Sequence, residues 1–217
     1  MKRLAADGAP EGTWLRADRQ TSGRGRSGRS WRSPPGNLYA STLVRLKGED
    51  PPAPTLALAA GVALHDVVRP ISPTAMLKWP NDLLIGARKI AGILLERVER
   101  VVIIGVGVNL ASHPEDVDRP ATSLRAEGNL APPPEVFMQD LAHAFSASLA
   151  TWRSALDEIL DRWLRSTHPV GTPLTTHGPA GETLSGVFAG LEPDGALRLR
   201  LADGEVRIIH AGDVFLV

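Results

Sequence analysis

Positive charge and glycine are concentrated in one short stretch of the sequence, from Arg19 to Arg32. The stretch holds five arginines, no acidic residue, and glycines at positions 23, 25 and 28. Guanidinium groups bind phosphate and carboxylate oxygens in a bidentate way, and glycines let backbone N–H groups approach an anion closely. The stretch is neither a P-loop nor a dinucleotide-binding fingerprint, because no Gly-Lys-Ser/Thr follows and no GxGxxG precedes a helix. Phosphate binding is favoured over the alternative, a solvated basic loop.

A second group of reactive side chains lies between Lys78 and Glu96. Lys89 opens an otherwise apolar strand, where it either reaches out to water or places a point charge in a pocket of low dielectric. Asn81 and Asp82 follow a proline, and they form either a simple turn or hard oxygen ligands for magnesium beside nucleotide phosphates. The sequence leaves both pairs of alternatives open at this point.

The third candidate is the run Gly105-Val106-Gly107-Val108-Asn109. Glycines inside a buried strand indicate either close approach of a ligand or backbone, or a bulge.

Composition excludes several classes of function. The 217 residues include 24 basic and 24 acidic side chains and no cysteine. Zero net charge argues against general electrostatic binding of nucleic acid or membranes, and the lack of cysteine excludes disulfides, thiolate metal sites and thioester catalysis. No apolar run is long enough for a membrane span, and no signal peptide opens the sequence. We therefore expect a cytoplasmic protein with no nucleic-acid or membrane partner.

Periodicity predicts the elements that position these groups. Strands are expected near residues 13–19, 37–46, 75–79, 83–85, 90–96 and 101–108, and the apolar runs of the last two are typical of strands covered on both faces. Helices are expected over residues 56–67, with Thr55 as a cap, and over 137–152 and 156–163. Residues 111–134 are expected to form a long loop that is either mobile or functional.

After His168 the pattern changes to period two, with Leu197, Leu199 and Leu201 alternating with arginines between two turn signals. This predicts a small β module, too short to be an enzyme by itself. We place the domain boundary so that residues 1–168 form a catalytic domain and residues 169–217 a C-terminal domain.

Four of these stretches together resemble the biotin protein ligases, the enzymes that attach biotin to carboxylases. They are residues 20–31, 33–41, 78–96 and 105–109, in the family's order and spacing, and the likeness extends over essentially the whole chain. The resemblance implies an α+β fold: a ligase domain like that of class II aminoacyl-tRNA synthetases, with a central mixed sheet covered by helices, followed by an SH3-like β-barrel.

The same resemblance implies roles for individual residues. Arg24, Arg26 and Lys89 would be catalytic, with Lys89 bridging the biotin carboxylate and the α-phosphate of ATP. The biotin and adenylate site would comprise Gln20, Gly23, Arg24, Gly25, Arg26, Trp31, Lys89, Gly92, Leu94 and Gly105. Asn81, Asp82 and Asn109 would lie near Mg²⁺ and the phosphates.

The sequence departs from the family at its start. Members carry a Ser-Thr-Asn stretch upstream of the glycine-arginine loop, and repressor-type members begin with a DNA-binding domain; neither is found in the 217 residues. We therefore expect an N-terminally truncated or misassigned catalytic domain, and weaker binding of biotin than in an extended chain.

The resemblance implies a two-step reaction with ATP and Mg²⁺. Biotin is activated as biotinyl-5′-adenylate, and the biotinyl group passes to a lysine of a biotin carboxyl carrier protein or domain. The alternatives are a lipoate ligase of the same fold, a non-catalytic module that binds biotin or carrier, and a nucleic-acid binder, which the single arginine cluster and zero net charge disfavour. The expected state is a monomer or a homodimer.

Overall fold

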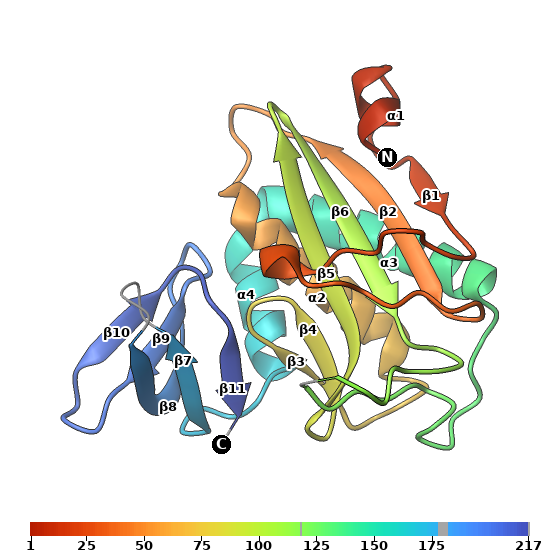
Figure 1. The fold of residues 1–217 in the computed structure, drawn as a ribbon. Helices are drawn as coiled ribbons and strands as arrows, with labels where there is room; N and C mark the ends of the chain where they lie inside the picture. The colour runs from red at the N-terminus through yellow and green to blue at the C-terminus, as the bar shows by residue number, and fades with distance from the viewer. Residues whose placement is uncertain (118, 178–181, 217) are drawn as a thin grey trace.

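The larger part of the molecule is built on a six-stranded antiparallel sheet (Figure 1). A computed structural model describes residues 1–117, 119–177 and 182–216. The strand order is β1-β2-β6-β5-β4-β3. The strands are β1 (Trp14–Arg16), β2 (Leu38–Arg45), β3 (Ala75–Lys78), β4 (Asp82–Ile85), β5 (Arg88–Val98) and β6 (Val101–Val108). All five pairings of neighbouring strands are antiparallel.

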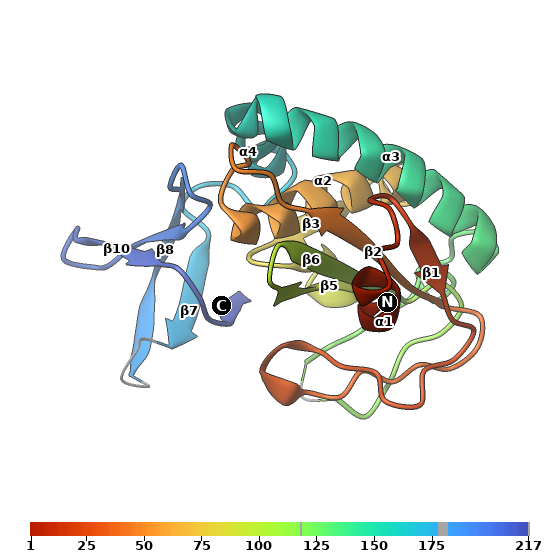
Figure 2. The same ribbon diagram turned by 90° about the horizontal axis from the view of Figure 1, so that it is seen from above.

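Three helices pack on one face of this sheet (Figure 2). They are α2 (Leu56–Val68), α3 (Pro134–Ser154) and α4 (Leu156–Arg165). Helix α2 is apolar on almost every side because it lies between the sheet and α3, and ten of its residues are buried. A short helix, α1 (Lys2–Ala6), precedes β1, and single 3₁₀ turns lie at Arg26–Gly28 and Ala53–Thr55. Among the described residues, no helix is both long enough and apolar enough to cross a membrane.

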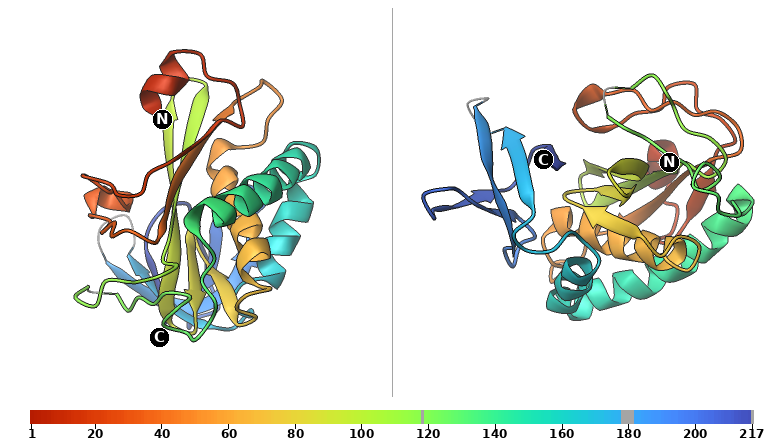
Figure 3. Two further views of the ribbon diagram at one scale, coloured as in Figure 1. Left: turned by 90° about the vertical axis from the view of Figure 1, so that its right-hand side faces the viewer. Right: turned by 90° about the horizontal axis from the view of Figure 1, so that it is seen from below.

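None of α2, α3 and α4 lies on the opposite face of the sheet, so the expected cover on both faces of β5 and β6 is not made by these helices. The segments after β1 and after β6 pass over this face as loops (Figures 2 and 3). The alternating burial along β6 has the same cause, since only one side of that strand meets the helices. The predicted α+β class is confirmed, but among the described residues parallel pairing is confined to isolated bridges, Leu77 with Thr167 and Lys89 with Ala121.

Thr55 does not cap α2 as predicted. Its hydroxyl donates a hydrogen bond to the Pro52 carbonyl at 2.6 Å and accepts one from Trp152 Nε1 at 2.7 Å. Thr55 and Trp152 are both buried, and a buried indole N–H needs an acceptor. Thr55 therefore serves the contact between α2 and α3.

The C-terminal module is a five-stranded antiparallel sheet of order β10-β9-β8-β7-β11. Its strands are β7 (Pro173–His177), β8 (Thr183–Leu191), β9 (Leu197–Arg200), β10 (Val206–Ile209) and β11 (Val214–Leu216). The edge strands β10 and β11 do not pair with each other within the described residues, so the predicted barrel is not closed there.

The module shares a core with the larger domain. The rings of Trp163 on α4 and Phe188 on β8 meet edge to face with centroids 6.5 Å apart. Trp79 Nε1, from the larger domain, donates a hydrogen bond to the Gly195 carbonyl at 3.0 Å. The predicted boundary after residue 168 falls between α4 and β7, in a region where buried side chains are continuous across it, and it stays a prediction.

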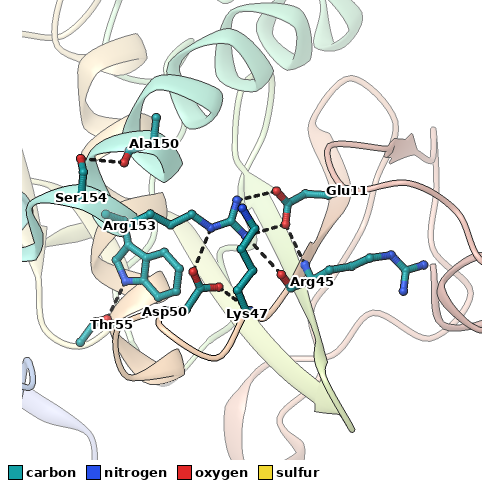
Figure 4. Close-up of polar contacts among 9 residues, drawn as sticks. Glu11, Arg45, Lys47, Asp50, Thr55, Ala150, Arg153 and Ser154 are labelled. Atoms are coloured by element: carbon teal, nitrogen blue, oxygen red, sulfur yellow. Dashed lines mark hydrogen bonds and ion pairs between the residues drawn. The ribbon is translucent and has the colours of Figure 1, made fainter.

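A network of charged groups ties the N-terminal segment to the far end of β2 (Figure 4). Arg153 on α3 makes an ion pair with Glu11 at 2.7 Å and with Asp50 at 3.0 Å, and it also donates to the Arg45 carbonyl at 3.2 Å. The hydrogen bond from Arg153 holds the pKa of Glu11 below its usual value of about 4.5. Arg153 thus links three segments through one guanidinium group.

We predict that Arg153→Ala lowers the free energy of unfolding by about 2–3 kcal/mol, because two carboxylates lose their common partner. The exposed Arg165 of α4 gives the control, and Arg165→Ala should change stability by less than about 0.5 kcal/mol. Urea denaturation measures both, and equal losses would contradict the role of the network.

Because the pKa of Glu11 is lowered in the folded state, its contribution to stability is present above about pH 4.5 and is lost at lower pH. In Arg153→Ala, the free energy of unfolding should therefore fall less steeply as the pH is lowered.

Candidate active site

A cavity of about 900 Å³ lies on the face of the sheet that carries Gly92, Leu94, Gly105 and Gly107. Its walls come from the loop after β1, from β5 and β6, from the loop after β6, and from the C-terminal module. Segments far apart in the sequence therefore meet at one place.

Almost all of the predicted site residues line this cavity. They are Gln20, Arg24, Gly25, Arg26, Trp31, Asn81, Asp82, Lys89, Gly92, Leu94, Gly105 and Asn109. Gly23 is the exception, and it has a packing role. A Cβ atom at this position would lie 2.2 Å from the Trp31 carbonyl oxygen and 2.8 Å from Gln20 Oε1, so only glycine fits.

The glycine-arginine stretch forms a small hairpin within its loop. The Gly25 N–H donates to the Arg29 carbonyl at 2.7 Å, and the Trp31 N–H donates to the Gly23 carbonyl at 2.9 Å. Gly28 at the turn has φ +73°, a conformation that favours glycine. The hairpin presents its arginines to the cavity and leads the chain back to Trp31.

Trp31 lies on a floor made by two glycines that are partners across β5 and β6, Gly92 and Gly107. A Cβ atom at Gly107 would lie 2.8–2.9 Å from three indole atoms, and one at Gly92 would lie 3.4 Å from the ring. A Cβ atom at Gly105, two residues along β6, would have its nearest neighbour at 3.7 Å. The glycines of this strand do allow a close approach, but at Gly107 the approaching group is a side chain, the Trp31 indole, and neither a ligand nor backbone. Trp31 Nε1 is buried without a hydrogen-bond partner among the described groups.

Lys89 does not extend to solvent, since its side chain is only 25% exposed. Its Nζ lies 2.5 Å from Asp82 Oδ1 and 5.5 Å from the centre of the Trp31 ring. Lys78 reaches the other oxygen of the same carboxylate at 3.7 Å, and burial lowers the pKa of Lys78. One carboxylate thus holds two ammonium groups at the end of the glycine floor.

The backbone of Lys89 is fixed by the loop after β6. The Lys89 N–H donates to the Pro120 carbonyl at 2.8 Å, and the Thr122 N–H donates to the Lys89 carbonyl at 2.9 Å. Asn109 supports this pairing, because its side-chain amide donates to the Thr122 carbonyl at 3.0 Å. The predicted site thereby gains a loop that sequence reasoning had not connected with Lys89.

Asn81 joins the arginine hairpin to the sheet. Its Oδ1 accepts a hydrogen bond from Arg26 Nη1 at 3.2 Å, and its Nδ2 donates to the Ile93 carbonyl at 2.5 Å. Burial lowers the pKa of Arg26, which remains a cation because guanidinium is so strongly basic.

The oxygens of Asn81 and Asp82, two of the three residues expected near Mg²⁺, are not free to bind the ion. The Asp82 carboxylate is paired with two lysines, and Asn81 Oδ1 is bound by a guanidinium group. Within the described residues, no group of three or more His, Cys, Asp or Glu side chains is arranged to hold a metal ion. The donor set therefore does not fit a resident metal.

Among the cavity residues that sequence reasoning missed are Arg119, Asp213 and Phe215. Asp213 forms ion pairs with Arg29 of the hairpin and with Arg119 of the loop after β6. Asp213 and Arg119 stand in no motif or periodic pattern, and their contact depends on how the C-terminal module packs against the larger domain. Only the unusual length of the loop after β6 pointed in this direction.

Known proteins resemble the chain along almost all of its length. The pattern of the biotin/lipoate A/B protein ligase family matches residues 3–109, and that of the biotin protein ligase C-terminal domain matches residues 176–217. A biotin–[acetyl-CoA-carboxylase] ligase of Paracoccus denitrificans is 36% identical, over 97% of this chain and 92% of the relative. A ligase of the same name from Mycobacterium tuberculosis is 36% identical, over 99% of this chain and 82% of the relative.

A solved structure agrees with these relatives. The biotin protein ligase of Aquifex aeolicus in complex with biotin and ATP superposes with a TM-score of 0.86 at 26% identity, over 100% of this chain and 94% of that one. Sequence and fold thus agree across both the sheet domain and the C-terminal module, and the chain belongs to the biotin protein ligase family.

Proposed function

We propose that this protein uses ATP to activate biotin as biotinyl-5′-adenylate and then transfers the biotinyl group to a lysine of a carrier protein or carrier domain. The observation that carries the proposal is the cavity itself. An apolar floor of glycines under Trp31 leads directly into the cluster of Lys89, Asp82 and Arg26. Such a site suits a ligand with an uncharged ring system at one end and an anion at the other.

The apolar end is the proposed seat of the biotin rings. Trp31, Gly92, Leu94 and Gly105 would line it, in keeping with their places in the cavity. Gln20 would contact biotin at the rim, where its Oε1 accepts a hydrogen bond from Ser33 Oγ at 2.7 Å. With that oxygen engaged, the amide N–H groups of Gln20 are left to donate to an oxygen of the ligand.

The basic end is the proposed site of chemistry. In the first step an oxygen of the biotin carboxylate attacks the α-phosphorus of ATP, and the bond to the bridging oxygen breaks to release pyrophosphate. Lys89 would lie between the two anions, while Arg24 and Arg26 would hold carboxylate and phosphate oxygens. In the second step the carrier amine attacks the acyl carbon, loses a proton, and AMP leaves. No protein nucleophile is required.

We assign Mg²⁺ to the substrate, as the complex of Mg²⁺ with ATP. The ion would then be bound chiefly by phosphate oxygens and water, which suits a site whose own oxygens are engaged. Asp82 would act mainly as the partner of the two lysines.

The carrier of a biotin-dependent carboxylase is the proposed acceptor, by analogy with the relatives named for acetyl-CoA-carboxylase. We also propose a cytoplasmic location, in keeping with the lack of cysteine and the need for ATP. The state of assembly, monomer or homodimer, stays a prediction.

The function is tested by incubating the protein with ATP and biotin and measuring pyrophosphate, followed by addition of a carrier domain and mass spectrometry of its lysine. We expect biotin-dependent pyrophosphate release and a carrier that gains one biotinyl group. Equal turnover with lipoate would favour the lipoate ligase instead. Binding of biotin without pyrophosphate release would favour a non-catalytic module.

We predict that Lys89→Ala slows adenylate formation about 100- to 1000-fold, because a charge directed at the reacting groups is lost. Binding of ATP alone should weaken much less, since the arginines and Lys78 remain. Single-turnover release of pyrophosphate measures the first effect and calorimetric titration the second. Lys89→Arg keeps the charge and serves as the second variant. An unchanged rate in Lys89→Ala would contradict the assignment.

We predict that Gly107→Ala displaces Trp31 even without ligand, because the new methyl group would overlap a rigid indole. The hydrogen bond from the Trp31 N–H to Gly23 should then open more often, and hydrogen exchange at Trp31 should become faster by about tenfold or more, which corresponds to about 1.4 kcal/mol. Gly105→Ala is the matched control on the same strand, and it should leave this exchange unchanged. Equal exchange in the two variants would show that the indole does not rest on Gly107.

A further inference from the structure

The loop after β6 brings one more cation, Arg119, into the cavity. We propose that Arg119 binds the β- and γ-phosphates of ATP, the part that leaves as pyrophosphate, and that Phe215 and Asp213 of the C-terminal module position it. This inference rests on the proposed function and adds a residue outside the motifs that the sequence singled out.

Arg119 is held from two sides by the turn between β10 and β11 and by β11 itself. Its Nη2 lies 3.1 Å from Asp213 Oδ2, and the centre of its guanidinium group lies 4.6 Å from the centre of the Phe215 ring. A guanidinium that rests on an aromatic ring keeps the N–H groups along its edge free to donate. The side chain is 31% exposed, so these contacts bury part of it and leave the rest open to the cavity.

Asp213 cannot neutralise the charge around it. The same carboxylate oxygen that meets Arg119 also meets Arg29 of the hairpin, so one negative charge serves two positive ones. Arg119 also acts electrostatically on Arg26 and Lys78, which are held by Asn81 and Asp82. The described basic groups at this end therefore outnumber their acids, which is the condition for binding a polyanion.

The order of the contacts assigns Arg119 to the outer phosphates. Lys89 touches both the Trp31 ring and Asp82, so it lies where the apolar end meets the basic end. Arg119, which lines the same cavity, has its partners on the C-terminal module instead, at Asp213 and Phe215. If Lys89 meets the carboxylate and the α-phosphate, Arg119 lies where the β- and γ-phosphates would extend from this junction toward the C-terminal module.

The test compares initial rates of biotin-dependent pyrophosphate release while ATP and biotin are varied separately. Arg119→Ala should raise the KM for ATP about tenfold, the usual scale for loss of a charge-assisted hydrogen bond, and leave the KM for biotin unchanged. Inhibition by added pyrophosphate should weaken by a similar factor. Inhibition by AMP, which lacks the outer phosphates, should stay the same. Arg119→Lys keeps the charge without the fork and should give an intermediate KM for ATP.

Two further variants separate binding from structure. Arg125 is exposed on the same loop, and Arg125→Ala should leave every constant unchanged. Phe215→Leu removes the ring beneath Arg119 without changing any charge, and it should raise the KM for ATP several-fold with kcat retained.

Each other outcome overturns the inference. An unchanged KM for ATP in Arg119→Ala would exclude phosphate binding, and equal rises in both KM values or in AMP inhibition would indicate a general disturbance of the site. Should Arg119→Ala fail to fold, Arg119→Lys with unaltered pyrophosphate inhibition would be equally decisive. The proposed function fails separately, namely if the unmodified protein releases no pyrophosphate from ATP and biotin.

Discussion

A carboxylate and a triphosphate repel each other in water, and the proposed reaction requires them to touch. In a chain of zero net charge, the positive charge that offsets this repulsion has to be gathered locally. Here Asp82 holds Lys89 and Lys78 together, two ammonium groups that would otherwise repel each other. The carboxylate keeps the lysines in place before the ligand arrives, and the surrounding arginines supply the excess charge. The remaining architecture serves to bring these groups to one point.

The sheet does so by keeping one of its faces clear of α2, α3 and α4. Helix α2, buried between the sheet and α3, supplies the core on one side, so the other side can be lined with glycines. The hairpin of β5 and β6 sets Gly92 opposite Gly107 and carries Lys89 at the start of the same strand, β5. One local pairing therefore fixes both the apolar floor and the key cation, and the loop after β6 then fixes the lysine backbone from the other side.

The sequence predicted the elements and the motif residues well because both leave local signals. Periodicity predicted the helices and strands, and the concentration of glycines and arginines predicted a loop, although not the hairpin that it forms. The sequence did not predict that α2, α3 and α4 all lie on one face of the sheet, since buried runs in β5 and β6 look alike whether helices or loops cover them. It also did not predict the pairing of Asp82 with Lys89, or the meeting of Arg119 with Asp213 and Phe215, because those contacts depend on register and docking rather than on neighbours in the chain.

The shared core between the two parts of the chain has a consequence for protein engineering. Trp79 donates a hydrogen bond to the Gly195 carbonyl, and the Trp163 ring packs edge to face against Phe188. Two tryptophans of the larger domain therefore hold the small sheet in place. A hybrid ligase made by exchanging C-terminal modules between relatives would have to carry the matching tryptophans and the turn around Gly195 with it. Exchanging the strands alone would leave the Trp79 N–H without an acceptor and the Trp163 ring without its partner. The residues on both sides of the interface would therefore have to be exchanged together.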